Sequence, residues 1–159
     1  MWQFLFGLTN AIALFGWLLL AAFPRKPLTM SAVLYLGVAL LCLCYAVMFV
    51  VLVGGWADPG AVPGAAPVDY ANYSIPGIRA LFMTDSGIVV GWTHYLAFDL
   101  FTGLWIARDA DHKGYARWVQ LPFLFATFMV GPIGLLSWLV VREGRARAVG
   151  RNQRAMRGS

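Results

Sequence analysis

The sequence predicts an all-α integral membrane protein, a bundle of four transmembrane helices with an irregular, interfacial segment between helices 2 and 3. Hydrophobic residues make up 60% of the 159 residues, charged residues make up 12%, and the mean hydropathy is +0.70. The apolar residues fall in four runs, each close to the roughly 20 residues that a helix needs to cross a bilayer. Backbone in lipid must satisfy its own hydrogen bonds, and these runs are too long for barrel strands, so we expect helices.

The four helices are expected at about residues 2–23, 31–54, 86–107 and 118–141. Two prolines and two cations at 24–27 mark an interfacial turn after the first helix. Ser31 is the expected N-cap of the second helix. The first run lacks the basic region and cleavage site of a signal peptide, so we expect a retained helix. Residues 1–142 then form one membrane domain, and residues 143–159 form a basic, flexible tail.

The stretch between the second and third helices divides into two parts. Residues 56–67 are rich in Gly, Pro and Ala and cannot form a regular helix. Residues 69–84 carry Tyr, Ile, Leu, Phe and Met side chains, which favour a short amphipathic helix after Pro76. This part is expected to cover one end of the bundle, either packed in the membrane interface or folded over the helices as a lid.

The positive charge is concentrated after the last apolar run, although the formal net charge is only +5. A basic tail beside a membrane helix contacts anionic lipid, so we expect membrane lipids and no nucleic acid as partners. Four spans place both ends of the chain on one face. Of the 12 Lys and Arg residues, seven then lie on that face and five on the other, which does not fix the orientation.

His94 and Asp99 are the residues that most directly indicate a function, because both interrupt the apolar run 86–107. A charge near the bilayer centre costs about 3 kcal/mol on insertion scales, and such groups usually serve a substrate, ion or proton path. For the same reason, we expect Asp99 to face the bundle interior. The two side chains lie about 140° apart around a helix, so they either converge on one elongated ligand or face two different neighbours.

A structural interpretation of the same residues stays open. Asp99 would bond to Tyr95, Thr102 or Asn10, and His94 would bond to a backbone carbonyl of a facing helix. Polar bonds between membrane helices are common and worth about 0.6–2 kcal/mol each. The aromatic residues that accompany them on the third and fourth helices fit either ordinary helix packing or a cavity for a hydrophobic ligand.

Other polar features are interpreted as structural. Residues 108–113 are expected to form a solvated loop. The chain has only two histidines, His94 and the one in this loop, so no metal site is expected. Cys42 and Cys44 point in different directions on a helix, so neither a disulfide nor a metal pair is expected. Pro132 predicts a kink in the fourth helix.

Two strings resemble the signature of the neoxanthin-synthase-like family, which comprises the plant abscisic-acid-deficient protein and its bacterial relatives. The first is GWTHYLAFDLFTG at 91–103, followed by WIARD at 105–109, and the second is FATFMVGPIGLL at 125–136. The order and spacing of the strings match along most of the chain. The resemblance implies a small multi-pass membrane protein linked to carotenoids, here expected in a bacterial inner membrane.

From this resemblance we expect a redox-neutral carotenoid isomerase that acts by cis/trans isomerisation or by epoxide-to-allene conversion. His94, Asp99 and Arg108 match polar positions of the first string, and Thr127 and Pro132 match the second. We expect His94 and Asp99 to exchange protons with the substrate, with no cofactor and no metal. The residues expected to bind the lipophilic, carotenoid-type ligand are Asn10, Trp92, Tyr95, Phe98, Thr102, Arg108, Thr127 and Phe128.

Two other functions stay open. The first is a non-catalytic pigment-binding or assembly subunit, in which His94 would ligate a chlorophyll-type magnesium or Asp99 would hold a carotenoid hydroxyl. The second is a proton-coupled carrier. A homo-oligomer and a pigment–protein complex are both compatible with the sequence.

Overall fold

The all-α prediction is confirmed by the computed structural model, which describes residues 1–23, 26–64 and 68–157, with side chains as far as residue 144. Within these residues the chain forms six helices. They are α1 (Trp2–Ala22), a continuous helix made of α2 (Pro27–Ala32), η1 (Val33–Ala39) and α3 (Leu40–Val53), then α4 (Ile75–Phe82), α5 (Asp85–His112), α6 (Arg117–Val130) and α7 (Pro132–Arg157).

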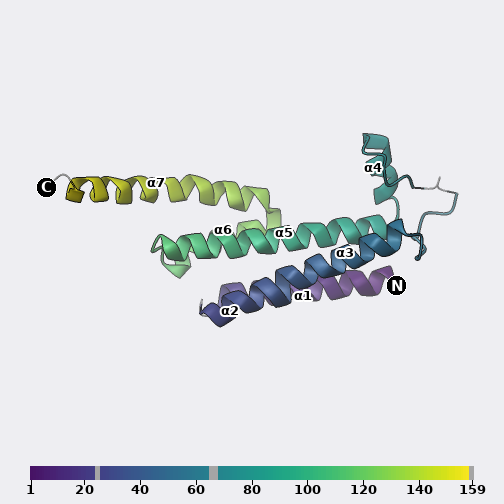
Figure 1. The fold of residues 1–159 in the computed structure, drawn as a ribbon, viewed down its shortest axis with the longest axis horizontal. Helices are drawn as coiled ribbons and strands as arrows, with labels where there is room; N and C mark the ends of the chain where they lie inside the picture. Colours follow the sequence, from purple (N-terminus) through teal and green to yellow (C-terminus); the bar gives the residue numbers. More distant parts are fainter. Residues whose placement is uncertain (24–25, 65–67, 158–159) are drawn as a thin grey trace.

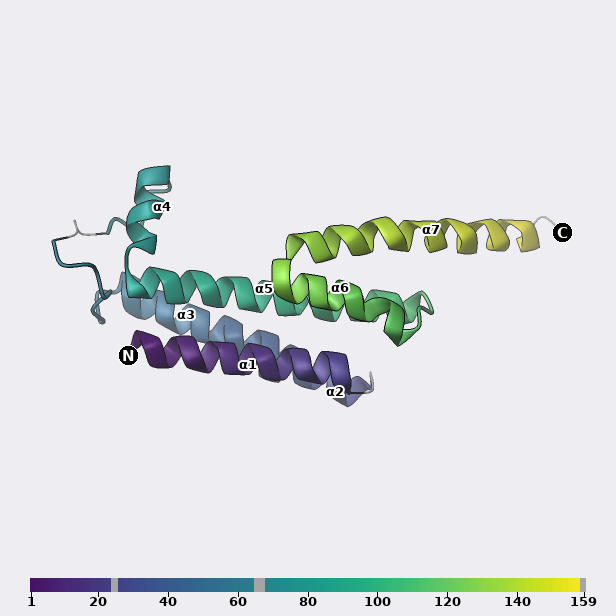
Figure 2. The ribbon, with the colours of Figure 1, turned by 180° about the vertical axis from the view of Figure 1, so that it is seen from behind.

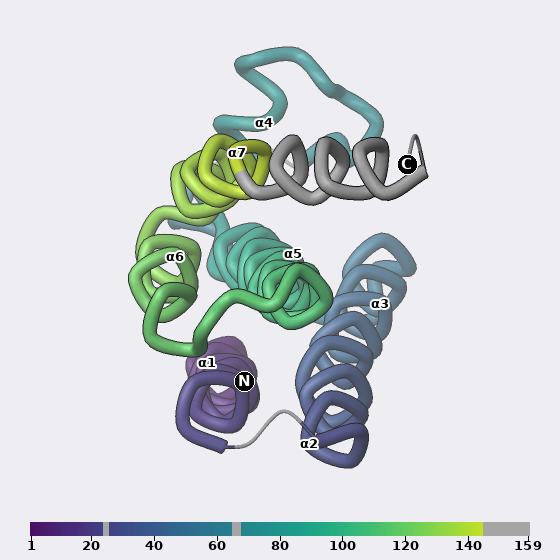
Figure 3. Tube along the Cα trace, turned by 90° about the vertical axis from the view of Figure 1, so that its left-hand side faces the viewer, coloured from purple at the N-terminus to yellow at the C-terminus, as the bar shows by residue number. Residues whose placement is uncertain are grey.

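The long helices lie side by side, with α5 in the middle (Figure 1). Seen down the bundle, α1, α3, α6 and the start of α7 surround α5 (Figure 3). The basal end of the bundle is the end at which α1 ends, the turn between α5 and α6 lies and α7 extends beyond the other helices. The distal end is the opposite one, where α1 and α5 begin and the segment 54–84 lies.

Small residues let three helices approach closely around Leu100, which is fully buried. A Cβ atom on Gly16 of α1 would lie 2.6 Å from Leu100 Cδ2, and one on Gly37 of η1 would lie 2.8 Å from the same atom. On the next turn of α5, Gly103 packs directly against the ring of Trp17. Such contacts are typical of helices that associate in a membrane by close packing.

The second helix begins earlier than expected and is not uniform. It starts at Pro27 with Lys26 as the N-cap residue, so Ser31 lies inside the helix and the predicted N-cap is wrong. Proline fits the first position of a helix, because its missing N–H group has no partner there in any case. Residues 33–39 adopt π-helical hydrogen bonding, which places Gly37 against Leu100.

The predicted fourth span, residues 118–141, is wrong as a single helix. α6 ends at Val130, Gly131 adopts φ +21°, and α7 begins at Pro132. The chain reverses there, so that α6 and α7 form an antiparallel hairpin that covers only the basal half of α5 (Figure 2). A kinked helix and a hairpin share the same apolar run, but a glycine with positive φ followed by proline favours a reversal.

In the part of the chain that the structure describes, two helical segments are long and apolar enough to cross a membrane, so the four predicted spans are not shown. They are Trp2–Ala22 and Pro27–Val53. α5 is long enough, but it carries Asp99, Thr93 and His94 in its middle and charged residues at both ends. α6 is apolar but has only 14 residues.

The segment between α3 and α5 is tied to the distal end by backbone contacts. The indole of Trp2 donates a hydrogen bond to the carbonyl of Asp58 at 2.8 Å, and the amide of Asp85 donates one to Gly60 at 3.2 Å. The short helix expected after Pro76 is present as α4. It begins at Ile75, so that Pro76 lies in its first turn, and the Ser74 hydroxyl accepts a hydrogen bond from the Gly77 amide as the N-cap.

No residue of α4 is buried, and the helix extends outward across the direction of α5 (Figures 1 and 3). Its last turn touches the bundle through Phe82, whose ring lies against Gly91. The structure therefore does not support the prediction that residues 69–84 cover the end of the bundle as a lid. The exposed Ile75 and Ile78 instead fit the alternative of an interfacial helix.

Candidate functional site

Asp99 faces the interior of the bundle, as predicted. The residue is 9% exposed, and within the described residues its Oδ2 atom has no hydrogen-bond partner. Its carboxylate lies directly against the backbone of Gly131, the turn of the α6–α7 hairpin. A buried carboxylate oxygen without a partner is costly, so it indicates either strain or a group that a ligand completes.

The turn of the hairpin has no side chain at the point of contact with Asp99. A Cβ atom on residue 131 would collide with both the Oδ1 and Oδ2 atoms, so only glycine leaves room for the carboxylate. α7 begins at the next residue, Pro132, so the Asp99 carboxylate lies at the turn between the two arms of the hairpin.

A row of polar and aromatic residues continues from Asp99 toward the distal end. The Tyr95 hydroxyl, one turn earlier on α5, interacts with the Asp99 carboxylate. The Trp92 ring lies 5.3 Å from the Tyr95 ring, between ring centroids, and its indole donates a 3.1 Å hydrogen bond to Asn10 Oδ1 of α1. Four of the sequence-predicted site residues therefore form one connected set: Asn10, Trp92, Tyr95 and Asp99.

This set lies on the part of α5 that α6 and α7 do not cover. α6 and α7 stop at Gly131, so they leave the distal half of α5 uncovered on that side (Figure 2). Trp92 is 40% exposed, and Tyr95 is partly exposed. A ligand could therefore reach the row from the side of the bundle, with the hairpin tip as the floor of the opening.

His94 lies apart from Asp99, on the face of α5 that meets α3. It is exposed, with its ring between Tyr45 and Phe98 at centroid distances of 5.6 and 4.6 Å. Of the two arrangements that the sequence left open, the structure therefore has the one in which His94 and Asp99 face different neighbours. A proton cannot pass directly between them.

The other predicted ligand-binding residues divide between several places. Thr102 donates its hydroxyl hydrogen bond to the backbone of Phe98 at 2.8 Å, and Thr127 donates one to Phe123 at 2.8 Å. Arg108 is exposed near the basal end. Thr127 is fully buried, with Gly134 of α7 packed on it, so it holds the two arms of the hairpin together.

An apolar groove lies between α1 and α6, on the outside of the bundle. Its volume is about 360 Å³, and its walls include Leu14, Trp17, Phe125 and Phe128. The Trp17 and Phe128 rings meet edge to face at 5.6 Å, so α1 and α6 are in contact at the groove. Phe128 lies about one helical turn before Gly131, the residue that contacts Asp99.

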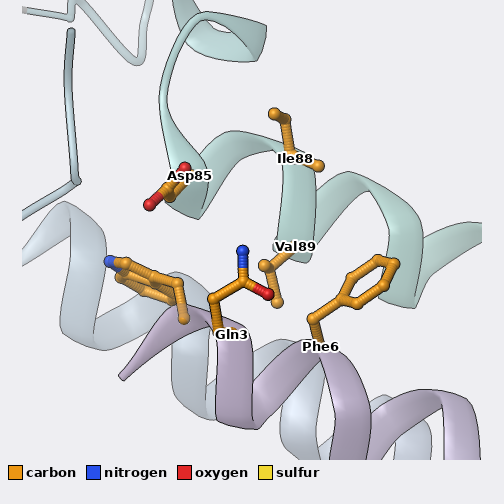
Figure 4. A pocket seen from close by; sticks show the side chains of 6 residues that line it. Gln3, Phe6, Asp85, Ile88 and Val89 are labelled. Carbon is orange, nitrogen blue, oxygen red and sulfur yellow. The ribbon is translucent and has the colours of Figure 1, made fainter.

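Two further hollows are less closely related to Asp99. One, also of about 360 Å³, lies between α5 and α7 and includes Thr102 and Trp105. The other, of about 160 Å³, lies between the beginnings of α1 and α5, where Gln3 and Asp85 face an apolar wall (Figure 4). None of the predicted site residues lines this distal pocket.

The basal end contains a polar cluster that the sequence did not reveal. Residues 108–113 were predicted as a solvated loop, but α5 continues to His112, so this prediction is wrong for all but the last of them. The Asp109 carboxylate accepts hydrogen bonds from Lys113 at 2.8 Å, from the Trp138 indole at 3.0 Å and from Arg142 at 3.0 Å. The Arg142 guanidinium also lies over the Trp105 ring at 5.2 Å.

This basal cluster joins α7 to α5. Burial by itself raises the pKa of the Asp109 carboxyl, but the hydrogen bonds from Lys113 and Trp138 and the charges of Arg142 and Lys113 outweigh it. The pKa of Asp109 is therefore below its ordinary value. Every oxygen of this carboxylate is bonded, so the cluster has the character of a structural clamp.

Within the described residues, no group of three or more His, Cys, Asp or Glu side chains could hold a metal ion. The site at Asp99 itself offers one buried carboxyl group, the Tyr95 phenol and the Trp92 indole, all among apolar side chains. Such a set can donate, accept or hold a proton.

Comparison with known proteins gives one family. The model of the ABA DEFICIENT 4-like family matches residues 4–138, from the first turns of α1 to Trp138 in α7. The matched region therefore includes the row at Asp99, His94 and the hairpin turn. No curated protein and no solved structure matches the chain.

Proposed function

Because this chain belongs to the ABA DEFICIENT 4-like family, which implies a role related to carotenoid and abscisic acid biosynthesis, we propose that it acts on a carotenoid within a membrane. The proposed reaction is a redox-neutral isomerisation, either cis/trans isomerisation of the polyene or opening of an epoxide to an allene. The acid is Asp99.

The observation that carries the proposal is the buried, unpartnered Oδ2 atom of Asp99. A carboxyl group among apolar side chains favours its neutral, protonated form, in which it can donate a proton. Asp109, on the same helix, has partners for both oxygens, which shows that this fold can satisfy a carboxylate where nothing else is required of it.

The proposed isomerisation needs one proton and no electrons. Protonated Asp99 donates its proton to a polyene carbon, and the positive charge spreads along the conjugated chain. The former double bond then rotates as a single bond. The Asp99 carboxylate takes a proton back from the same carbon, which restores the polyene in its new geometry. In the epoxide route Asp99 donates its proton to the epoxide oxygen, and the C–O bond breaks. The Asp99 carboxylate then takes a proton from a neighbouring carbon, which forms the allene.

Several features support a long apolar substrate at this position. The α1–α6 groove is almost wholly apolar, and Phe128, which lines it, is three residues before the hairpin turn at Gly131. The row of Trp92 and Tyr95 offers aromatic faces and polar tips for an oxygenated end group. We therefore propose that the polyene lies along the groove side of the bundle and meets Asp99 where the hairpin ends.

The proposal is tested by the pigments of a carotenoid-producing bacterial host with and without this chain. We expect a new geometric isomer, or an allenic product where the host makes an epoxide, to appear by chromatography only when the chain is expressed. The Asp99→Asn variant, expressed to the same level, should give the pigment profile of the host alone. An unchanged profile in hosts that supply both substrate types would exclude the enzymatic function.

A second function is favoured by the surroundings of His94. Its imidazole is exposed on the outside of the bundle and packs against the rings of Tyr45 and Phe98. This position suits a ligand to the magnesium of a chlorophyll-type pigment held by Tyr45 and Phe98. In that case the purified protein carries a bound pigment band that His94→Ala abolishes, and no carotenoid conversion occurs. The enzymatic proposal instead expects His94→Ala to convert carotenoid normally.

A further inference from the structure

We propose that the chain crosses the membrane three times and that α6 and α7 form a re-entrant hairpin, which enters from the basal face and leaves by the same face. The spans are α1, the continuous helix α2–η1–α3, and residues 86–107 of α5, so that Asp109 lies outside the membrane-spanning part. The basal face is then cytoplasmic, and the start of α1 and the segment 54–84 lie on the opposite side. This topology does not depend on the proposed reaction.

The lengths of the helices support this arrangement. At 1.5 Å per residue, the 21 residues of α1 extend about 31 Å, close to the thickness of the hydrocarbon core. The 14 residues of α6 extend only about 21 Å, which is too short to cross it. The apolar part of α7, from Pro132 to Val141, extends about 15 Å and then meets Arg142.

The basal cluster fixes the depth of the hairpin. Arg142 pairs with Asp109, in the last turn of α5, with its Nε atom 2.9 Å from Asp109 Oδ2. The hairpin therefore leaves the bundle at the level where α5 ends. Its turn, Gly131, lies beside Asp99, which is about 15 Å further along α5. The turn of the hairpin is thus near the middle of the membrane, where its backbone is covered by α5 rather than exposed to lipid.

The cations gather at one face in this topology. Six Lys and Arg residues have described side chains, and five of them belong to the basal end: Lys26, Arg108, Lys113, Arg117 and Arg142. The sixth, Arg79, belongs to the distal end. In the sequence, Arg25 adjoins Lys26, and the five remaining arginines follow Arg142. Three carboxylates lie at the distal end: Asp58, Asp69 and Asp85.

This asymmetry gives the orientation and the partner of the basal face. Membrane proteins retain Lys and Arg on the cytoplasmic side, where the leaflet carries anionic lipid. A division of eleven to one among the 12 cations of the sequence is decisive, whereas four spans would divide them seven to five. The basal surface therefore fits the headgroups of anionic phospholipids.

The test uses single cysteines in a background without Cys42 and Cys44. Tyr73, Ala116 and Glu143, all exposed, are changed to cysteine one at a time. A membrane-impermeant maleimide is added to intact spheroplasts or to inside-out vesicles. We expect Tyr73→Cys to react in spheroplasts, and Ala116→Cys and Glu143→Cys to react only in inside-out vesicles. Lys26→Cys provides a second basal position, with the same expected result.

Ala116 and Glu143 decide between the two topologies, because they flank the hairpin. Labelling of these positions from opposite sides would mean that residues 118–141 cross the membrane, and it would overturn the proposal. Labelling of both in spheroplasts would overturn the orientation. Ile133→Cys, beside the turn, should react from neither side until detergent is added. Reaction of Ile133→Cys in either intact preparation would overturn the mid-membrane position of the hairpin.

Discussion

Asp99 and Asp109 lie on the same helix, about three turns apart, yet their surroundings are opposite. Asp109 sits at the basal end and accepts hydrogen bonds from Lys113, Trp138 and Arg142. Asp99 sits at the tip of the hairpin, next to the Gly131 backbone, with its Oδ2 atom unpartnered within the described residues.

The difference between the two carboxylates follows the difference between the two halves of the bundle, of which the basal half is structural and the distal half contains the candidate site. The basal half of the bundle is covered by α6 and α7, and Trp138 is fully buried between the Tyr115 and Phe123 rings. The distal half lacks this cover, and there the row of Asn10, Trp92 and Tyr95 is accessible from the side. The Asp109 carboxylate, with both oxygens bonded, holds the hairpin in place, and the Asp99 carboxylate, with Oδ2 unbonded, is the one to which the proposed function assigns the substrate.

The largest expected effect is on activity and comes from Asp99→Asn. This change keeps the shape of the side chain but removes the acid, and general acid catalysis contributes about 10²–10⁴-fold to rate. We expect carotenoid conversion to fall by at least about 100-fold, with little change in melting temperature in detergent.

The matched control is Asp109→Asn, the same substitution on the same helix. We expect this variant to convert carotenoid at close to the normal rate per folded molecule, at a temperature where it remains folded. Equal loss of conversion in the two variants, when corrected for folded protein, would contradict the separation of scaffold from site.

The next largest effect is on stability and comes from Gly131→Ala. Alanine at φ +21° is strained, and its Cβ atom would collide with the Asp99 carboxylate. Backbone strain and overpacking together should cost about 3 kcal/mol of unfolding free energy and displace Asp99, so that conversion is lost as well. Thermal unfolding and conversion are measured on the same preparation. A variant with normal stability and normal conversion would mean that the hairpin turn does not pack on Asp99.

A smaller effect on stability is expected for Asp109→Asn. The substitution leaves the partly buried Arg142 and Lys113 groups without their charged partner, and hydrogen bonds to charged groups are worth about 2 kcal/mol each. We expect the unfolding free energy in detergent to fall by about this amount. Arg142→Gln should give a similar loss, and the double variant should lose less than the sum, because the two residues share one interaction.

The contribution of Asp109 should also depend on pH. Because the pKa of this carboxyl is lowered in the folded protein, its contribution is fully present above the ordinary aspartate pKa of about 4 and is lost as the pH falls through the lowered value. The difference in melting temperature between wild type and Asp109→Asn should therefore be constant near neutral pH and shrink below about pH 4. A difference that grows on acidification would contradict the ion pairs at the basal cluster.

The smallest effect is expected for Gly7→Ala in α1. A Cβ atom at Gly7 would have no neighbour within 4 Å, and alanine favours a helix over glycine by about 1 kcal/mol or less. We expect unchanged conversion and unchanged or slightly higher stability. This variant shows that a glycine-to-alanine change as such is harmless, in contrast to Gly131→Ala.

Much of the fold followed from the sequence. The apolar runs predicted the bounds of α1 to within one residue. They also predicted α5 as a helix that begins within one residue of its actual start. The hairpin did not follow, because residues 118–141 are apolar for about the length of a span whether they run straight or fold back. The Gly131–Pro132 pair is the signal for a reversal, but the same pair also fits a kink.

The site was predictable only in part. The cost of a buried charge identified Asp99 and its position in the interior. Periodicity placed Tyr95 and Trp92 on its face, but it could not show that Trp92 bonds to Asn10 of another helix. The basal cluster was missed because Asp109 and Arg142 are far apart in the sequence, and residues 108–113 look like a polar loop.

The most direct test of proton transfer by Asp99 is deuterium uptake by the carotenoid itself. Purified protein is incubated in D₂O with a carotenoid that it isomerises, and the recovered polyene is analysed by mass spectrometry. If Asp99 adds a deuteron to a CH carbon of the polyene and then removes the hydrogen that was already on that carbon, the product carries carbon-bound deuterium, and Asp99→Asn gives neither product nor deuterium. Isomerisation without deuterium uptake, at the same rate in Asp99→Asn, would contradict the role that we assign to Asp99.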